Sequence, residues 1–187
     1  MLVHRAVFAA VILIAAVPVS ASAELTIEEL RGGILAQGCC GQGTNKESGA
    51  AINAEIVFAS PKFLSVLGSP RPVVGASVAT NTGATSQIYT SLEWRFTLSP
   101  RFFVSGGGGV AIHDGETDPF DPVADAARIS TTLFLGCRAL FRINGNVGYQ
   151  ISDRVSAMFY WAHISNAGLC QDNEGLDHTG MRLGYSF

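Results

Sequence analysis

The sequence predicts an all-β protein, a transmembrane β-barrel of about eight antiparallel strands of the kind found in bacterial outer membranes. Apolar and polar residues alternate with a period of two in segment after segment, which is typical of strands with one apolar and one polar face. Long polar connections alternate with tight turns, as they do between the two rims of such barrels. A segment typical of exported proteins precedes these strands.

Residues 1–23 are predicted to be a signal peptide. His4 and Arg5 form a basic start, an apolar run follows, and Ala21-Ser22-Ala23 is a small-residue cleavage pattern. The alternative, a helical membrane anchor, is disfavoured because the apolar run ends before the roughly 20 residues that a spanning helix needs. We expect residues 24–187 to form a single outer-membrane barrel domain, since no linker divides them.

The expected strands follow one another along the whole mature chain. In residues 50–59 the even positions are apolar while Asn53 and Glu55 are polar, and in residues 87–96 the odd positions include Glu93 and Arg95. The expected strands lie near residues 30–37, 50–59, 72–80, 86–98, 101–113, 138–151, 155–165 and 177–187. An even number of strands suits a closed antiparallel barrel.

The lengths of the connections between strands predict which rim of the barrel is periplasmic and which is extracellular. Residues 39–49, 114–128 and 166–176 are long and polar, whereas Ser99-Pro100 and 152–154 are tight turns. Two connections depart from this pattern: residues 60–71 are long for a periplasmic turn, and residues 80–85 are short for an outer loop.

Chemistry decides which face of each strand meets lipid. Charged side chains on the lipid face cost several kcal/mol at the bilayer midplane, so the apolar set must face the hydrocarbon. Glu93, Arg95, Arg142 and Arg182 therefore face the interior. A barrel of about eight strands has little free lumen, so we expect these side chains to fill it rather than to line a channel.

Composition excludes some partners and leaves the cysteines undecided. A formal net charge of −3 without a basic cluster argues against nucleic acid. Export permits disulfides among the four cysteines, and four cysteines allow three pairings. A bond from Cys39 or Cys40 to Cys170 would join the first long loop to the last; the alternative, that some thiols stay free, remains open. Zinc is not expected, because no paired C-x-x-C spacing is present.

A candidate catalytic set lies on the last two expected strands. His163 and Ser165 are two residues apart and share the lipid-facing side of one strand, and Asp177 has the outward parity of the next. Ser165 would attack an acyl carbonyl, His163 would accept its proton, and Asp177 would orient the imidazole. Asn166 and the backbone N–H near Gly168 could stabilise the oxyanion.

Other interpretations of these residues stay open. His163 and Ser165 could simply belong to the polar rim where a strand leaves the membrane. His178 has the interior parity, and it is more typical of a hydrogen-bonding side chain than of a catalyst. Glu174 or Asp172, in the last loop, could replace Asp177 as the acid if that loop folds back.

The motif His163-x-Ser165-Asn166-Ala167-Gly168, with an acidic residue 14 positions after the histidine and an aromatic-ended final strand, resembles the lipid A 3-O-deacylase (PagL-type) family. The resemblance implies an outer-membrane esterase that acts on lipid A, with His163 and Ser165 as catalytic residues, Asn166 at the oxyanion, and no cofactor or metal. Its acidic member is usually glutamate, so the reach of the shorter Asp177 to His163 is in doubt without a shift of the last strand.

The resemblance implies lipid A and the surrounding outer-membrane lipid as partners, and it brings a homodimer into consideration. Two other functions remain as alternatives: an outer-membrane phospholipase, and a non-catalytic barrel with a structural or adhesive role. Release of fatty acid from phospholipid would favour the first, and unchanged lipid A profiles would favour the second.

Overall fold

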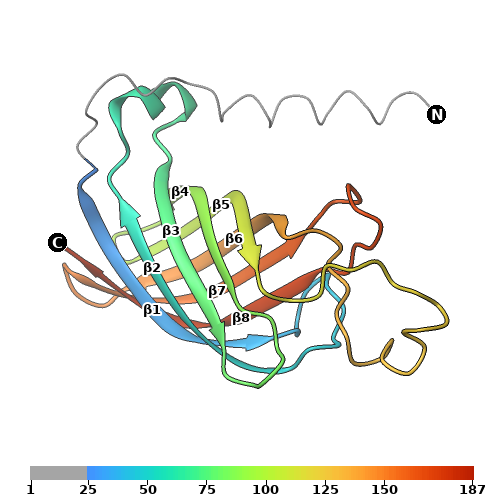
Figure 1. Ribbon diagram of the computed structural model, residues 1–187. Coiled ribbons are helices and arrows are strands. Elements are labelled where there is room, and N and C mark those ends of the chain that lie inside the picture. The colour runs from blue at the N-terminus through green and yellow to red at the C-terminus, as the bar shows by residue number, and fades with distance from the viewer. Residues whose placement is uncertain (1–24) are drawn as a thin grey trace.

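A computed structural model describes residues 25–187 as a closed eight-stranded antiparallel barrel (Figure 1), which confirms the predicted fold class. Each strand pairs with its sequence neighbours, and β1 pairs with β8 to close the sheet. The strands are β1 (Ile27–Gln37), β2 (Gly49–Phe58), β3 (Arg71–Ala79), β4 (Gln87–Thr97), β5 (Phe102–His113), β6 (Ala139–Gln150), β7 (Val155–Ser165) and β8 (Leu176–Ser186). The predicted signal peptide lies entirely outside the described residues.

Side chains alternate between the two faces as the period of two predicts. Ile34 is 69% exposed and Met181 58% exposed on the outer wall, whereas Arg142 and Arg182 are buried inside. The outer wall is therefore apolar and the interior polar, as a lipid-embedded barrel requires. Among residues 25–187, no helix is long and apolar enough to cross a bilayer.

Ion pairs and hydrogen bonds fill the barrel interior. Arg31 contacts Glu93 at 2.9 Å and Glu29 at 2.8 Å, and Arg182 contacts Glu55 at 2.7 Å. Charges removed from water must be paired and hydrogen-bonded, and the Arg31–Glu93 and Arg182–Glu55 pairs join strands that are distant in the sequence. The predicted filling of the interior by charged side chains is confirmed.

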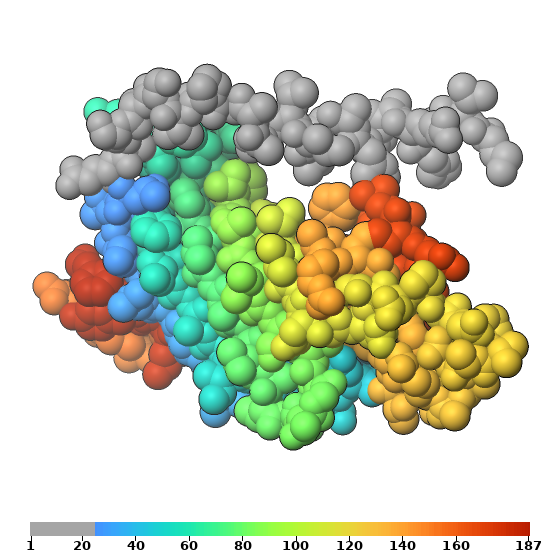
Figure 2. Space-filling model, viewed as in Figure 1, coloured from blue at the N-terminus to red at the C-terminus, as the bar shows by residue number. Residues whose placement is uncertain are grey.

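The long connection between β5 and β6 closes one end of the barrel. Its residues Leu133 and Leu135 are buried against Tyr89, Ile164 and Leu176 at the mouth. The rest of this connection projects beyond the barrel wall (Figure 2). The β1–β2, β5–β6 and β7–β8 connections meet at this end, while the C-terminus lies at the other (Figure 1).

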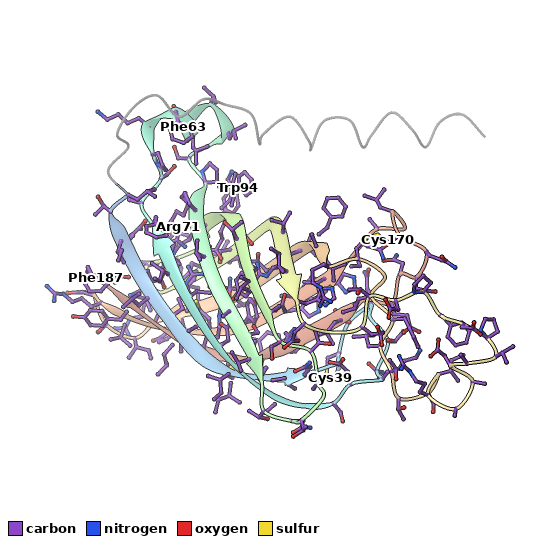
Figure 3. The ribbon with its side chains drawn as sticks, in the orientation of Figure 1. Cys39, Phe63, Arg71, Trp94, Cys170 and Phe187 are labelled. Carbon is purple, nitrogen blue, oxygen red and sulfur yellow. A yellow bond between two sulfur atoms is a disulfide. The ribbon has the colours of Figure 1, made fainter. Side chains whose placement is uncertain are left out.

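A disulfide joins Cys137 to Cys170 and so ties the β5–β6 connection to the β7–β8 connection. The expected pairing of Cys39 or Cys40 with Cys170 is therefore wrong. The β5–β6 connection folds back over the mouth and brings Cys137 to Cys170, while Cys39 and Cys40 carry free thiols with their Sγ atoms 2.6 Å apart. Figure 3 shows Cys39 and Cys170 at the end with the long loops.

The connection between β2 and β3, residues 59–70, contains a short helix, η3 (Lys62–Leu67). Gly68 ends it with a φ of 81°, a left-handed conformation that suits glycine. The Trp94 indole N–H donates a hydrogen bond of 2.8 Å to the Leu67 carbonyl. Phe63 and Trp94 thus lie together at the end opposite Cys39 and Cys170 (Figure 3).

Candidate active site

The candidate catalytic residues lie on the outer wall where β7 and β8 reach the loop-bearing end. Ala162 and Ile164 point inward and are fully buried, so His163 and Ser165 point outward, as predicted. His163 and Ser165 are each partly exposed on the lipid-facing side. Among the described residues, no hydrogen bond joins the Ser165 hydroxyl to His163; such contacts are often long until substrate binds.

His163 and Asp177 are directly opposite each other in the β7–β8 ladder. Opposite residues in an antiparallel pair have Cβ atoms about 4.5–5.5 Å apart, which is within reach of a short carboxylate. The distance from His163 Nδ1 to Asp177 Oδ1 is 3.0 Å. The doubt about the reach of Asp177 is thereby removed, since no shift of the last strand is needed.

This contact decides how the imidazole is protonated. A carboxylate can only accept, so Nδ1 carries the hydrogen and donates it to Asp177. In the neutral ring, Nε2 is then left with a free lone pair, which is the form that a general base requires. Asp177 therefore holds Nδ1 of the His163 ring, and Nε2 is free to accept a proton.

Two further residues hold the imidazole ring. Trp161 stacks beside it with ring centroids 6.3 Å apart and an angle of 14° between the ring planes. On another side lies Gly175, where an added Cβ would come within 2.3 Å of His163 Cε1. Only glycine leaves room for the ring at that position.

Asp177 has the outward parity of β8 but is covered, with only 1% of the residue exposed. The cover is the β1–β2 connection, in which the Gly43 backbone N–H donates a hydrogen bond to Asp177 Oδ2. Among the described residues, no lysine or arginine forms an ion pair with Asp177; its charged-group partner is His163. Apart from His163, the acid is held by a neutral backbone donor.

The other predicted residues occupy different surroundings. Glu174 accepts a 2.8 Å hydrogen bond from the Phe134 N–H and pairs with Lys46, so it ties two connections together. The Asp172 side chain accepts a 2.6 Å hydrogen bond from the Phe120 N–H. His178 lies inside the barrel with Nδ1 at 3.3 Å from Gln87.

The Asn166 side chain is buried and fully engaged. Its amide nitrogen donates to the carbonyls of Leu135, at 2.8 Å, and Asp172, while its oxygen accepts from the Gly168 N–H at 2.8 Å. Both groups proposed for the oxyanion therefore hold the β5–β6 and β7–β8 connections in place here.

An apolar groove lies beside Ser165 on the outer wall. It has a volume of about 160 Å³ and is lined in part by Val110, Phe141 and Leu169. Phe141 is the ladder partner of Ser165, so the groove begins next to the serine. Its lining suits a hydrocarbon chain.

The family model for lipid A 3-O-deacylase (PagL) matches residues 71–186. The chain belongs to this family. A crystal structure of the outer membrane enzyme PagL superposes with a TM-score of 0.61 at 15% identity, covering 85% of this chain and 99% of that one. A de novo designed transmembrane β-barrel matches with a TM-score of 0.45 at 10% identity, covering 87% and 98% of the two chains. No curated protein sequence matches significantly.

The PagL-family match ends at the last residue of β8 and includes the whole His163–Asp177 pair, but it begins at β3. The β1–β2 connection that covers Asp177 lies outside the matched residues. Sequence reasoning missed Gly41 and Gly43, because a glycine-rich loop carries no signal for the residue on which it will rest. Among the described residues, no group of three or more histidine, cysteine or carboxylate side chains could hold a metal ion.

Proposed function

We propose that this PagL-family chain is an outer-membrane esterase that hydrolyses the 3-O-linked acyl chain of lipid A. The observation that carries the proposal is the 3.0 Å contact between His163 Nδ1 and Asp177 Oδ1 on the lipid-facing wall, two residues from Ser165. A histidine oriented by a buried acid beside a hydroxyl is the arrangement of a serine hydrolase.

The reaction would proceed in two halves. Ser165 Oγ attacks the acyl carbonyl while His163 Nε2 takes the hydroxyl proton, and Asp177 stabilises the imidazolium that forms. His163 then returns the proton to the sugar oxygen as the carbon–oxygen bond breaks, which leaves an acyl-enzyme. A water molecule, activated by the same imidazole, releases the fatty acid and restores Ser165.

The position of the site favours a substrate that is already dissolved in the membrane. His163 and Ser165 face outward near the rim, where an outer-leaflet glycolipid would present its ester at the boundary between sugar and acyl chains. The groove lined by Val110, Phe141 and Leu169 would accept the hydrocarbon chain beside Ser165. A soluble substrate would gain nothing from this apolar wall.

We assign oxyanion stabilisation to Asn166, the position that the family motif indicates, and to the Gly168 N–H beside it. Their present hydrogen bonds are to Leu135, to Asp172 and to each other, so at least one has to be exchanged when the ester binds. The proposed homodimer and the proposed removal of residues 1–23 remain separate predictions.

The test is the mass of lipid A from cells that express the wild type, Ser165→Ala, His163→Ala, or the matched control Ser130→Ala in an exposed loop. We expect loss of one acyl chain from lipid A with the wild type and the control only. Heat-modifiable migration on gels would show that all four barrels form.

Three other results would contradict this proposal or favour an alternative function. Full deacylation by both Ser165→Ala and His163→Ala would overturn the assignment of the catalytic residues. Fatty acid released from phospholipid but not from lipopolysaccharide would indicate a phospholipase. Unchanged lipids throughout would favour a non-catalytic barrel.

A further inference from the structure

The connection between β1 and β2 lies across the outer wall and over the start of β8. Its backbone follows β8 through hydrogen bonds from the Gly38 N–H to the Asp177 carbonyl, at 2.9 Å, and from the Thr44 N–H to the Gly175 carbonyl, at 3.1 Å. Between these two points the Gly43 N–H reaches the Asp177 carboxylate. Figure 3 shows Cys39, near the start of this connection, at the loop-bearing end.

The β1–β2 connection approaches β8 so closely that two of its positions have no room for a side chain. A Cβ on Gly41 would lie 2.2 Å from Asp177 Cγ, and a Cβ on Gly43 would lie 2.3 Å from the Gly175 carbonyl oxygen. Gln42, between them, is exposed. The glycines therefore serve contact with the acid, because the backbone itself rests on the carboxylate.

The two oxygens of Asp177 have separate partners. Oδ1 accepts from His163, and Oδ2 accepts from Gly43. A carboxylate held at only one oxygen could rotate about its bond to Cβ and lose its alignment with Nδ1. Holding the second oxygen prevents that rotation, and covering the group excludes water that would compete for it.

We propose that the backbone at Gly41 and Gly43 forms a positioning strap for the catalytic acid. The strap acts through Asp177 and does not touch the reacting atoms, so its members are positioning residues. The inference rests on the proposed function. It extends that function to a connection that lies outside the region matched by the family model.

The experiment is a double-mutant cycle on the full-length protein, using purified lipopolysaccharide in detergent micelles. Gly41→Ala is measured in the wild-type and the Asp177→Asn backgrounds, with Gln42→Ala as the matched control. We expect Gly41→Ala to lower kcat about 10- to 100-fold with KM little changed, since a displacement of about 1 Å costs that much. In the Asp177→Asn background it should change kcat less than about twofold, because the group on which it acts has lost its charge.

A merely structural role would give a different pattern. Equal losses from Gly41→Ala in both backgrounds, or no loss in either, would overturn the strap. Heat-modifiable migration establishes that each barrel has folded, and Gly43→Ala provides a second variant should Gly41→Ala fail to fold. An inactive wild type would refute the proposed function instead, so the two failures are distinguishable.

Discussion

Two buried carboxylates in this barrel have opposite surroundings. Glu55, in the interior, lies within 3.5 Å of the guanidinium groups of three arginines, the closest being Arg182 at 2.7 Å. Asp177, on the outer wall, accepts hydrogen bonds from the His163 imidazole and the Gly43 N–H. A carboxylate already neutralised by arginines serves the fold, whereas one that no arginine contacts keeps its charge available for an imidazolium.

Asp177→Asn should have the largest effect on catalysis. The amide would present the wrong partner to Nδ1 and would remove the charge that stabilises the imidazolium, so kcat should fall roughly 10³- to 10⁴-fold. Lipopolysaccharide deacylation by the purified protein measures this, with the exposed Asp118→Asn as control. A loss of kcat below tenfold would contradict the catalytic role that distinguishes Asp177 from Glu55.

The Glu55→Gln variant should lose stability rather than catalytic rate. Removing one charge from the interior network leaves buried arginines unpaired, at a cost of about 3–5 kcal/mol in the free energy of unfolding. Urea unfolding in detergent, followed by tryptophan fluorescence, measures it. Glu28→Gln is the matched control at the rim, where a half-exposed side chain pairs with Arg71 at 3.6 Å and should contribute less than about 1 kcal/mol. Equal stability of the two variants would contradict a structural role for Glu55.

Gly175→Ala tests the geometry of the outer site without changing any charge. The new Cβ would displace the His163 ring, so we expect kcat to fall about 10- to 100-fold while the barrel stays stable. Gly32→Ala is the control: a Cβ there would meet its nearest neighbour at 3.7 Å. Unchanged activity in Gly175→Ala would mean that the ring tolerates a different position.

The smallest effect is expected from the double variant Cys137→Ser with Cys170→Ser. It frees two connections that flank the groove, while the ion-pair network stays intact. We expect a loss of a few fold in the deacylation rate and little change in the urea midpoint of the barrel. A large fall in that midpoint would show that the disulfide also supports the strand scaffold.

Much of this architecture could be read from local pattern. The alternation of Glu93 and Arg95 with apolar neighbours predicted a polar interior, and the same parity placed His163 and Ser165 on the outer wall. The alternation of side chains between two faces follows from strand geometry alone, so it does not depend on how the rest of the chain folds. The family motif added the roles of these residues without any knowledge of distances.

Other features depend on how the connections fold over the barrel. The sequence contains Cys39, Cys40 and Cys170 without indicating that Cys170 bonds to Cys137, because loop paths are set by packing such as that of Leu133 and Leu135 at the mouth. The alternation of faces placed Asp177 on the outer wall, but it could not predict that the β1–β2 connection would cover this side chain.

The sequence by itself determined the fold class, the face of each strand and the residues of the candidate site. The tertiary structure decided the register that pairs His163 with Asp177, and it brought Gly41 and Gly43 onto the acid. The physical reason is that strand periodicity is a local property of consecutive residues, whereas register and loop docking depend on contacts between different segments. His163 and Asp177 lie on neighbouring strands, and Gly43 and Asp177 are 134 residues apart in the chain.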